Sequence, residues 1–145
     1  MISFFVLGIP APKGSARAFF VKKRGRAVIT AANAKTRPWE QAIRSEAEIA
    51  RHGAPASTSA VRVRAVFRFP RPAGHFRANS PVLRPSAPLA HAKKPDVDKL
   101  ARTLLDALSG VLFVDDAQVV RLEAGKRFVE PGESPGVDVD VEEIR

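Results

Sequence analysis

The sequence predicts an α+β protein in which a single mixed β-sheet is covered by two packed helices. Three observations lead to this prediction. Several segments alternate apolar and charged residues, as half-buried strands do, and two others repeat apolar residues at helical spacing. The two kinds of segment are interleaved along the chain, which favours one mixed sheet. The 145 residues, 45% of them hydrophobic, fit one domain over residues 1–145 with its own core.

The N-terminal third is predicted to contain a strand and a hairpin. Residues 1–7 (MISFFVL) form an apolar, β-prone run that Gly8 and Pro10 end. A turn over residues 12–17 follows and carries two cations, Lys13 and Arg17. Residues 18–30 then resemble a short hairpin whose tip lies at residues 23–26.

The first helix is predicted over residues 38–51. Pro38 suits its first turn, and Gly53 and Pro55 end it. Apolar residues at helical spacing define a stripe that should face the core: Trp39, Ala42, Ile43, Ala47 and Ala50.

Residues 61–69 (VRVRAVFRF) alternate and predict a half-buried strand with a basic outer face of Arg62, Arg64 and Arg68. A solvated face and a DNA-binding surface explain that face equally well. Residues 70–95 contain half of the twelve prolines and are expected to form a long loop. Because the loop leads into an acidic motif, we expect it to be functional. His75 within it is interpreted as a solvated side chain, with substrate contact as the alternative.

The second helix is predicted over residues 99–109. Asp98 is placed to cap it, and Gly110 fits the position just beyond its end. Its apolar face consists of Leu100, Leu104, Ala107 and Leu108. Residues 111–129 return to β character around an acidic turn. Residues 137–142 alternate valine with acidic residues, which predicts a last strand with an acidic outer face.

The net charge of the chain indicates which class of molecule it binds. The formal net charge is +9, from 24 Lys+Arg against 15 Asp+Glu, which favours nucleic acid before acidic membranes. The absence of cysteine excludes disulfides, thiolate zinc sites and cysteine nucleophiles, and fits a reducing cytoplasm. With no signal peptide and no apolar stretch near the roughly 18 residues that span a bilayer, we expect a soluble, cytoplasmic protein without a membrane partner.

Two acidic clusters are candidate metal ligands: Asp96 with Asp98, and Asp115 with Asp116. Carboxylates two residues apart just before a helix can converge, and a later segment can supply a third. Bound Mg²⁺ is the simplest compensation for gathered carboxylates, and hard oxygen ligands favour Mg²⁺ or Mn²⁺ over Zn²⁺. A helix cap at Asp98 and a simple turn at Asp115-Asp116 are the alternatives.

Phosphodiester hydrolysis is the chemistry that such a site would support. It needs an activated water and a stabilised leaving oxygen, and metal ions held by aspartates supply both, often as pairs about 4 Å apart. Cations near the acidic pair would neutralise the phosphate. Four of them surround it in the sequence: Lys93, Lys94, Lys99 and Arg102.

The motif itself resembles a known family. Residues 94–100 (KPDVDKL), 106–111 (DALSGV), 115–120 (DDAQVV) and Lys126 together resemble the RusA family, which comprises Holliday junction resolvases of bacteria and their phages. The opening residues 8–14 (GIPAPKG) and the helix entry at Trp39-Glu40 are also similar. The resemblance covers nearly the whole chain, and its central motif is long and gapless.

The resemblance implies a specific activity. Family members are homodimers that bind a four-way DNA junction and cut two opposing strands with Mg²⁺, in recombination and repair. Their catalytic aspartates correspond here to Asp96, Asp98 and Asp116, with Asp115 as a secondary candidate ligand. A two-fold dimer suits this substrate because it presents two equivalent sites to two equivalent strands. A bacterial or prophage gene would be the source.

Two positions depart from the family pattern. Lys99 stands where the family usually has asparagine, and Arg102 stands where it has a catalytic lysine. Arginine keeps the charge and binds phosphate through two donors, but it does not give up a proton. If the family lysine only stabilises charge, Arg102 can substitute for it. If the family lysine donates a proton to the leaving group, activity should fall unless Lys99 takes over. Asp106, four residues after Arg102, is placed to orient it.

The resulting prediction is a Mg²⁺-dependent endonuclease, with Mn²⁺ as a substitute. Expected phosphate contacts are Lys13, Arg17, Lys93, Lys94, Lys99 and Lys126. A branched-DNA-binding module without cleavage is the alternative that the altered lysine keeps open, and a flap or fork nuclease is another. The acidic triad argues against the first, because three carboxylates without a metal would only repel phosphate.

Overall fold

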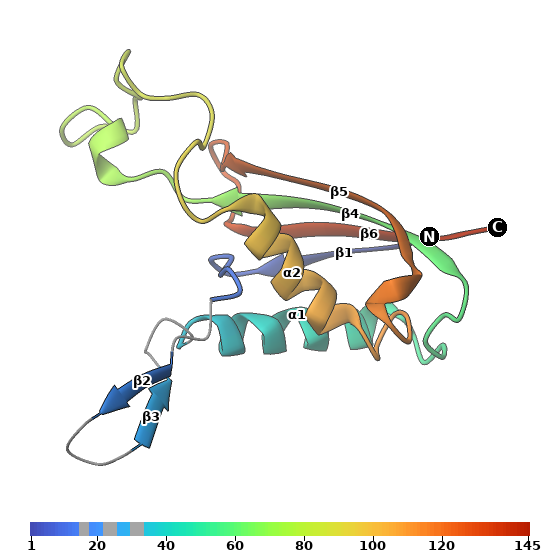
Figure 1. Ribbon diagram of the computed structural model, residues 1–145. Coiled ribbons are helices and arrows are strands. Elements are labelled where there is room, and N and C mark those ends of the chain that lie inside the picture. The colour runs from blue at the N-terminus through green and yellow to red at the C-terminus, as the bar shows by residue number, and fades with distance from the viewer. Residues whose placement is uncertain (15–17, 22–25, 30–33) are drawn as a thin grey trace.

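The computed structural model describes residues 1–14 and 34–145 in full, together with the backbone of residues 18–21 and 26–29. Its main sheet has four strands in the order β1-β6-β4-β5 (Figure 1). Strands β4 and β5 are parallel, and the other neighbours are antiparallel. The predicted mixed sheet is therefore confirmed. Its strands are β1 (Ile2–Leu7), β4 (Ala60–Phe69), β5 (Val119–Phe128) and β6 (Gly136–Ile144).

The predicted hairpin is present but does not join the main sheet. Strands β2 (Ala18–Val21) and β3 (Arg26–Ile29) pair with each other as a separate two-stranded sheet, set apart from the main one in Figure 1. The expectation of a single sheet therefore holds only for the four longer strands. Most of the predicted hairpin tip, and Arg17 in the turn before it, lie outside the described residues.

Both helices lie on the same face of the main sheet (Figure 1). Helix α1 (Thr36–Ala50) packs against β1 and α2, and α2 (Val97–Leu108) packs against β5 as well. Neither helix in this part of the chain has the length and apolar character that a bilayer crossing requires. The core between helices and sheet contains fully buried side chains from four elements: Ile43 and Ala47, Leu100, Leu104 and Leu108, Val61, Val63 and Phe67, and Val137 and Val139.

Helix α1 begins two residues earlier than predicted. The hydroxyl of buried Thr36 donates a hydrogen bond to the carbonyl of Pro12 at 2.7 Å, which ties the start of the helix to the segment after β1. The predicted apolar stripe is confirmed at Trp39, Ile43 and Ala47, which are buried. The helix ends at Ala50, followed by the positive φ of Gly53.

The prediction that Asp98 caps α2 is wrong. The helix begins at Val97, and the N-cap is Asp96, whose backbone is extended with φ −71° and ψ 139°. The first helical hydrogen bond runs from the Leu100 amide to the Asp96 carbonyl at 3.1 Å. Aspartate suits both positions, so the residue type alone could not place the boundary. Asp98 lies inside the first turn instead, where its carboxylate faces outward.

The predictions for residues 111–129 and for the loop over residues 70–95 were partly correct. Of residues 111–129, only Val119–Phe128 form a strand; a buried turn containing Phe113 and a short 3₁₀ helix, Asp116–Gln118, precede it. The long loop over residues 70–95 contains one 3₁₀ turn, Ala73–His75, and a bridge between Phe76 and Leu83. The rest of that loop is irregular, as its prolines predict.

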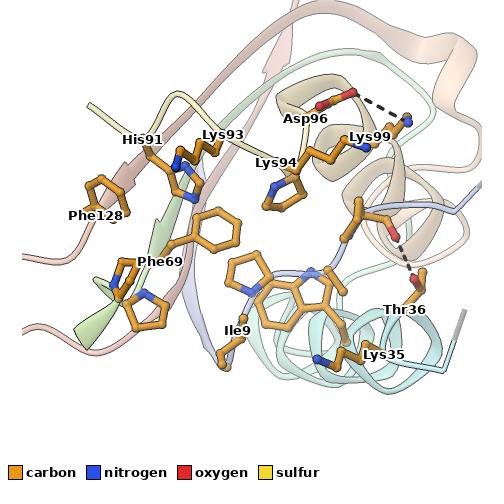
Figure 2. Close-up of a pocket in the computed structure, with 18 of the residues that line it drawn as sticks. Ile9, Lys35, Thr36, Phe69, His91, Lys93, Lys94, Asp96, Lys99 and Phe128 are labelled. Carbon is orange, nitrogen blue, oxygen red and sulfur yellow. Dashed lines mark hydrogen bonds and ion pairs between the residues drawn. The ribbon is translucent and has the colours of Figure 1, made fainter. Parts of the chain in front are cut away.

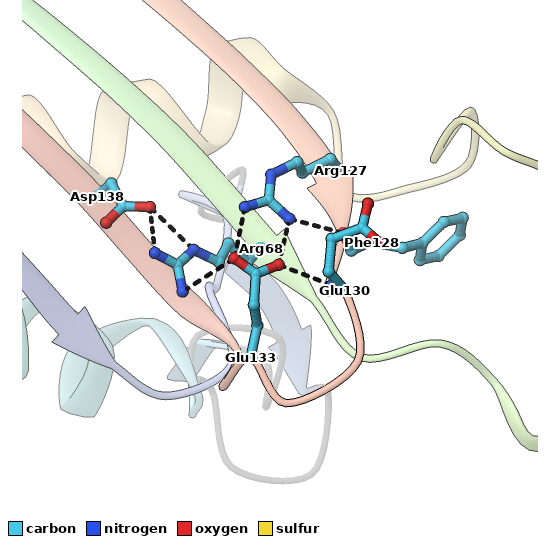
Figure 3. Close-up of polar contacts among 6 residues, drawn as sticks. All are labelled: Arg68, Arg127, Phe128, Glu130, Glu133 and Asp138. Carbon is cyan, nitrogen blue, oxygen red and sulfur yellow. Dashed lines mark hydrogen bonds and ion pairs between the residues drawn. The ribbon is translucent and has the colours of Figure 1, made fainter. Parts of the chain in front are cut away.

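The uncovered face of the sheet is neutralised by cross-strand ion pairs. Arg68 of β4 binds Asp138 of β6 at 2.6 Å (Figure 3). Arg62 of β4 binds Glu142 of β6 in the same way. At the end of β5, Arg127 holds both carboxylate oxygens of Glu133, at 2.7 and 2.9 Å. The acidic face of β6 thus pairs with the basic face of β4. For Arg62 and Arg68 this pairing supports the solvated interpretation over a DNA surface.

We expect Glu133→Gln to destabilise the protein at neutral pH but not in acid. The Arg127 guanidinium beside Glu133 lowers the pKa of this carboxyl from 4.5 to about 2. A lowered pKa in the folded state contributes stability above pH 4.5, and that contribution is lost as the pH falls through about 2. The midpoint of thermal unfolding should therefore be lower in the variant at pH 7 and match the wild type near pH 2.

Glu143→Gln is the matched control, because Glu143 is exposed and makes no ion pair among the described residues. Its unfolding midpoint should follow the wild type at every pH. A Glu133→Gln deficit that stays constant from pH 7 to pH 2 would show that the carboxylate charge is not what stabilises this corner.

Candidate active site

One face of α2 carries the polar residues of the candidate site. Because Leu100, Leu104 and Leu108 face the core, the residues spaced four apart on another face, Asp98, Arg102 and Asp106, face outward. They line a small pocket of 260 Å³ together with Asp116 and residues Ala101, Leu105 and Leu122. The structure therefore brings together two predicted metal ligands and the predicted catalytic cation.

The turn that carries Asp116 is held by a capping box. The Asp115 carboxylate accepts a hydrogen bond from the Ala117 amide at 2.9 Å, and the Gln118 side-chain oxygen accepts one from the Asp115 amide at 2.8 Å. The Gln118 amide group also donates to the carbonyls of Ser57 and Ser59, at 2.8 and 2.7 Å. The turn is thereby attached to the segment before β4. Asp115 serves as the cap, and Asp116 is left for the pocket.

The carboxylates around Asp116 leave the pocket with excess negative charge. The Asp115 carboxyl beside it, and more distantly Asp106, raise the pKa of Asp116 above its usual range. The Ala117 amide, in contrast, lowers the pKa of Asp115. A bound cation would relieve this repulsion, and the oxygen donors of Asp98 and Asp116 suit Mg²⁺ or Mn²⁺. The donor set of the pocket thus fits the predicted metal.

Asp96 lies in a different hollow from Asp98 and Asp116. It lines a larger groove of 1230 Å³, where its carboxylate pairs with Lys99 at 3.7 Å (Figure 2). Exposed Lys93 and Lys94 line the same groove. Within the described parts of the chain, no three acidic or histidine side chains gather closely enough to form a metal-binding group. The three predicted ligands are therefore neighbours along α2 and its flanking turn, but they do not converge.

An aromatic cluster anchors the long loop to the sheet beside this groove. His91 stacks on Phe128 with ring centroids 4.7 Å apart, and Phe69 meets His91 edge-on at 4.8 Å. His75 packs edge-on against Phe128 at 5.2 Å, so it is neither a free solvated side chain nor directed at the acidic pocket. Burial lowers the pKa of His91, which keeps its ring neutral at pH 7. The cluster therefore behaves as a small core.

The predicted phosphate-binding cations fall into three groups. Lys93, Lys94, Lys99 and Arg102 are exposed around the groove and the pocket. The Lys126 ammonium is instead used inside the protein, where it donates to the carbonyls of Lys93 and Pro95. Lys126 thus holds the loop that leads to Asp96, and its expected role as a DNA contact stays a prediction. Arg17 lies outside the described residues.

Asp106 contacts Lys13 rather than Arg102. The Lys13 ammonium lies 2.9 Å from the Asp106 carboxylate and 3.8 Å from that of Glu40. Arg102 makes no hydrogen bond or ion pair with any residue that the structure describes. The expectation that Asp106 orients Arg102 is therefore wrong, because a lysine distant in sequence occupies the carboxylate.

Sequence reasoning missed the roles of Gln118 and Glu40. Gln118 had a readable signal, since aspartate followed three residues later by glutamine is the pattern of a capping box. Glu40 had none, because its contact with Lys13 depends on how the segment after β1 crosses the two helices. Both residues act on the site through others rather than by lining the pocket.

We expect Gln118→Ala to loosen the turn that carries Asp116. The substitution removes one hydrogen bond to the Asp115 amide and two to carbonyls, so the free energy of unfolding should fall by about 1–3 kcal/mol. Hydrogen exchange at the Asp115 amide should accelerate. The other glutamine, exposed Gln41 on α1, provides the matched control, and Gln41→Ala should change neither quantity. Equal behaviour of the two variants would contradict the positioning role of Gln118.

Comparison with known proteins places these features in a family. Residues 10–142 match the family described as Endodeoxyribonuclease RusA. The uncharacterized protein YqaN of Bacillus subtilis (strain 168) is 35% identical over 68 residues, a match that spans 47% of this chain and 42% of that protein. The family match covers nearly the whole chain and confirms the resemblance seen in the acidic motif. The chain belongs to the RusA family of endodeoxyribonucleases, which are hydrolases that act on DNA.

Proposed function

We propose that this protein is a Mg²⁺-dependent, structure-specific endonuclease that resolves Holliday junctions in DNA recombination and repair. The observation that carries the proposal is the pocket in which Asp98 and Asp116 lie beside the guanidinium of Arg102, which pairs with no residue that the structure describes. Carboxylates for a metal and a cation for a phosphate are the two requirements of phosphodiester hydrolysis. The family to which the chain belongs supplies the substrate class.

Asp98, Asp116 and Asp96 form the proposed ligand set. When bound, the metal would activate the attacking water and stabilise the leaving oxygen. Asp98 and Asp116 already share a pocket, whereas Asp96 is held in the adjoining groove by Lys99. That pair is exposed, and such pairs contribute only about 0–1 kcal/mol, so Asp96 can exchange Lys99 for a cation at little cost. In this proposal Asp115 is not a ligand. Its carboxylate accepts a hydrogen bond from the Ala117 amide and so positions Asp116.

Arg102 is the residue proposed to neutralise the phosphate. Its guanidinium is always charged and presents two parallel donors to phosphate oxygens. Electrostatic groups of this kind contribute roughly 10²–10³ in rate when they face the developing charge. Lys93, Lys94 and Lys99 line the larger groove, where they would fix the position of the DNA backbone rather than read its sequence.

The two alternative functions make different demands on the same surface. A DNA-binding module without cleavage would place uncompensated carboxylates against phosphate, because Asp98, Asp106 and Asp116 line the same pocket. A flap or fork nuclease would use the same chemistry on another substrate. The two enzymes differ in whether two sites must act on opposing strands.

Asp98→Asn and Asp116→Asn should each lower cleavage of a labelled four-way junction in Mg²⁺ by at least about 100-fold, a larger loss than outer-shell substitutions cause. Affinity for the junction should be equal to or tighter than that of the wild type, because each variant removes a negative charge near phosphate. Asp140→Asn is the matched control. Asp140 lies in β6, where it accepts a hydrogen bond from Ser3 of β1 and lines neither the pocket nor the groove. Unchanged cleavage in either pocket variant would remove that residue from the site.

Symmetric cleavage further predicts a homodimer. Light scattering should give twice the 15.7 kDa of one chain, both free and on DNA. Junction, flap, fork and duplex substrates should then be compared, and the junction should be cut in two opposing strands. A monomer that cuts flaps or forks at least as well would replace junction resolution with the flap or fork activity.

A further inference from the structure

We propose that Lys13 is a positioning residue that keeps Arg102 available for phosphate by occupying the carboxylate of Asp106. The inference rests on the proposed function of the pocket. It assigns a role to the ion pair between Lys13 and Asp106, and it replaces the expectation that Lys13 contacts DNA directly.

The position of Lys13 is determined by its backbone. The Lys13 amide donates to the Lys99 carbonyl in α2 at 3.1 Å, and the preceding carbonyl, of Pro12, accepts from Thr36 at the start of α1. The segment after β1 is therefore attached to both helices. From this point the Lys13 side chain reaches the Asp106 carboxylate at 2.9 Å.

Two cations compete for Asp106. Arg102 precedes it by four residues on α2, a spacing at which oppositely charged side chains normally meet. Both residues line the same pocket, yet the carboxylate binds Lys13. The hydrogen bond that the Lys13 ammonium donates to Asp106 raises the pKa of Lys13, so the ammonium stays charged at neutral pH. Glu40, 3.8 Å away on the other side, adds to the field that holds it.

Removing the Lys13 charge would affect Arg102 in two ways that act in the same direction. The Asp106 carboxylate would lose its partner, and the guanidinium four residues away offers a two-donor match to it. The pocket would also become more negative by one charge, next to Asp116 in the same pocket. Both changes oppose the approach of a phosphate to Arg102, and both disappear if Asp106 is made neutral.

A direct DNA contact by Lys13 predicts something different. A lysine that neutralises a phosphate adds about 0.9 to the slope of log affinity against log salt. Its loss would therefore weaken binding at every salt concentration and flatten that slope. Neutralising Asp106 would not restore the lost contact, so the two roles separate cleanly.

The test compares single-turnover cleavage and junction affinity for Lys13→Met, Lys13→Arg and Lys13→Met combined with Asp106→Asn, with Arg102→Ala setting the scale of full loss. Lys13→Met should lower the rate at least about threefold, which corresponds to a few tenths of a kcal/mol for a helical ion pair plus the added charge. Its affinity should fall only slightly, by the effect of one added negative charge, and recover in the double variant, while its salt slope should match the wild type because no phosphate contact is lost. Lys13→Arg should keep the rate, and the double variant should recover most of it.

A second readout needs no cleavage. In Lys13→Met, the Arg102 side-chain Nε–H signal in an NMR spectrum should shift and its exchange with water should slow, because Asp106 now holds it. The signal should return to the wild-type position in the double variant. Glu40→Gln provides the control, since it leaves the 2.9 Å contact between Lys13 and Asp106 in place.

Each contrary outcome has a distinct meaning. A weaker affinity and a flatter salt slope in Lys13→Met, without recovery in the double variant, would make Lys13 a phosphate contact and overturn the proposal. Asp106→Asn alone losing as much as Arg102→Ala would place Asp106 itself in the chemistry and also overturn it. A lower unfolding midpoint that the double variant does not restore would leave the pair purely structural. If the wild type cuts no DNA, the proposed function fails, and the NMR comparison still decides which cation holds Asp106.

Discussion

Leu100, Leu104 and Leu108 of α2 are fully excluded from solvent, and their burial determines where the polar side of the helix can lie. Each buried leucine contributes roughly 1.5–3 kcal/mol, so the helix cannot rotate about its axis without a large loss of stability. The outward side chains of Asp98 and Arg102 are thereby held against the start of β5, where the turn with Asp116 meets them. The chemistry of the pocket depends on an apolar contact on the other side of the same helix.

Most of the fold was accessible from local pattern, because alternation and helical spacing report which face of a segment is buried. Both helices and the strands β4 and β6 were predicted for this reason, whereas β1 was predicted from an apolar run and β5 only as a return to β character. The residue at which α2 begins was not predicted correctly, since aspartate suits both the cap position at 96 and the first turn at 98. The partner of Asp106 could not be predicted either. Lys13 is distant in sequence, and only the crossing of the segment after β1 over α2 brings the two together.

The net charge of +9 indicated nucleic acid but not which surface binds it. Among the described residues, two groups of cations differ in how they are paired. On the uncovered face of the sheet, the arginines of β4 are matched by the acidic residues of β6, as Arg68 is by Asp138. On the helix side, the exposed cations Lys93, Lys94 and Arg102 surround the groove and the pocket. Cations that a polyanion could contact therefore lie next to the carboxylates of the pocket and groove.

The hydrogen bonds from Lys126 to the carbonyls of Lys93 and Pro95 have a mechanical consequence. They join the end of the proline-rich loop to β5, so Lys93, Lys94 and the start of α2 form one continuous unit with the sheet. A force exerted by a DNA backbone bound to these lysines would be transmitted to β5 rather than displacing the loop alone. A bent or strained substrate would then pull on the scaffold as a whole, and the spacing between the lysines and the carboxylates would stay constant under that load.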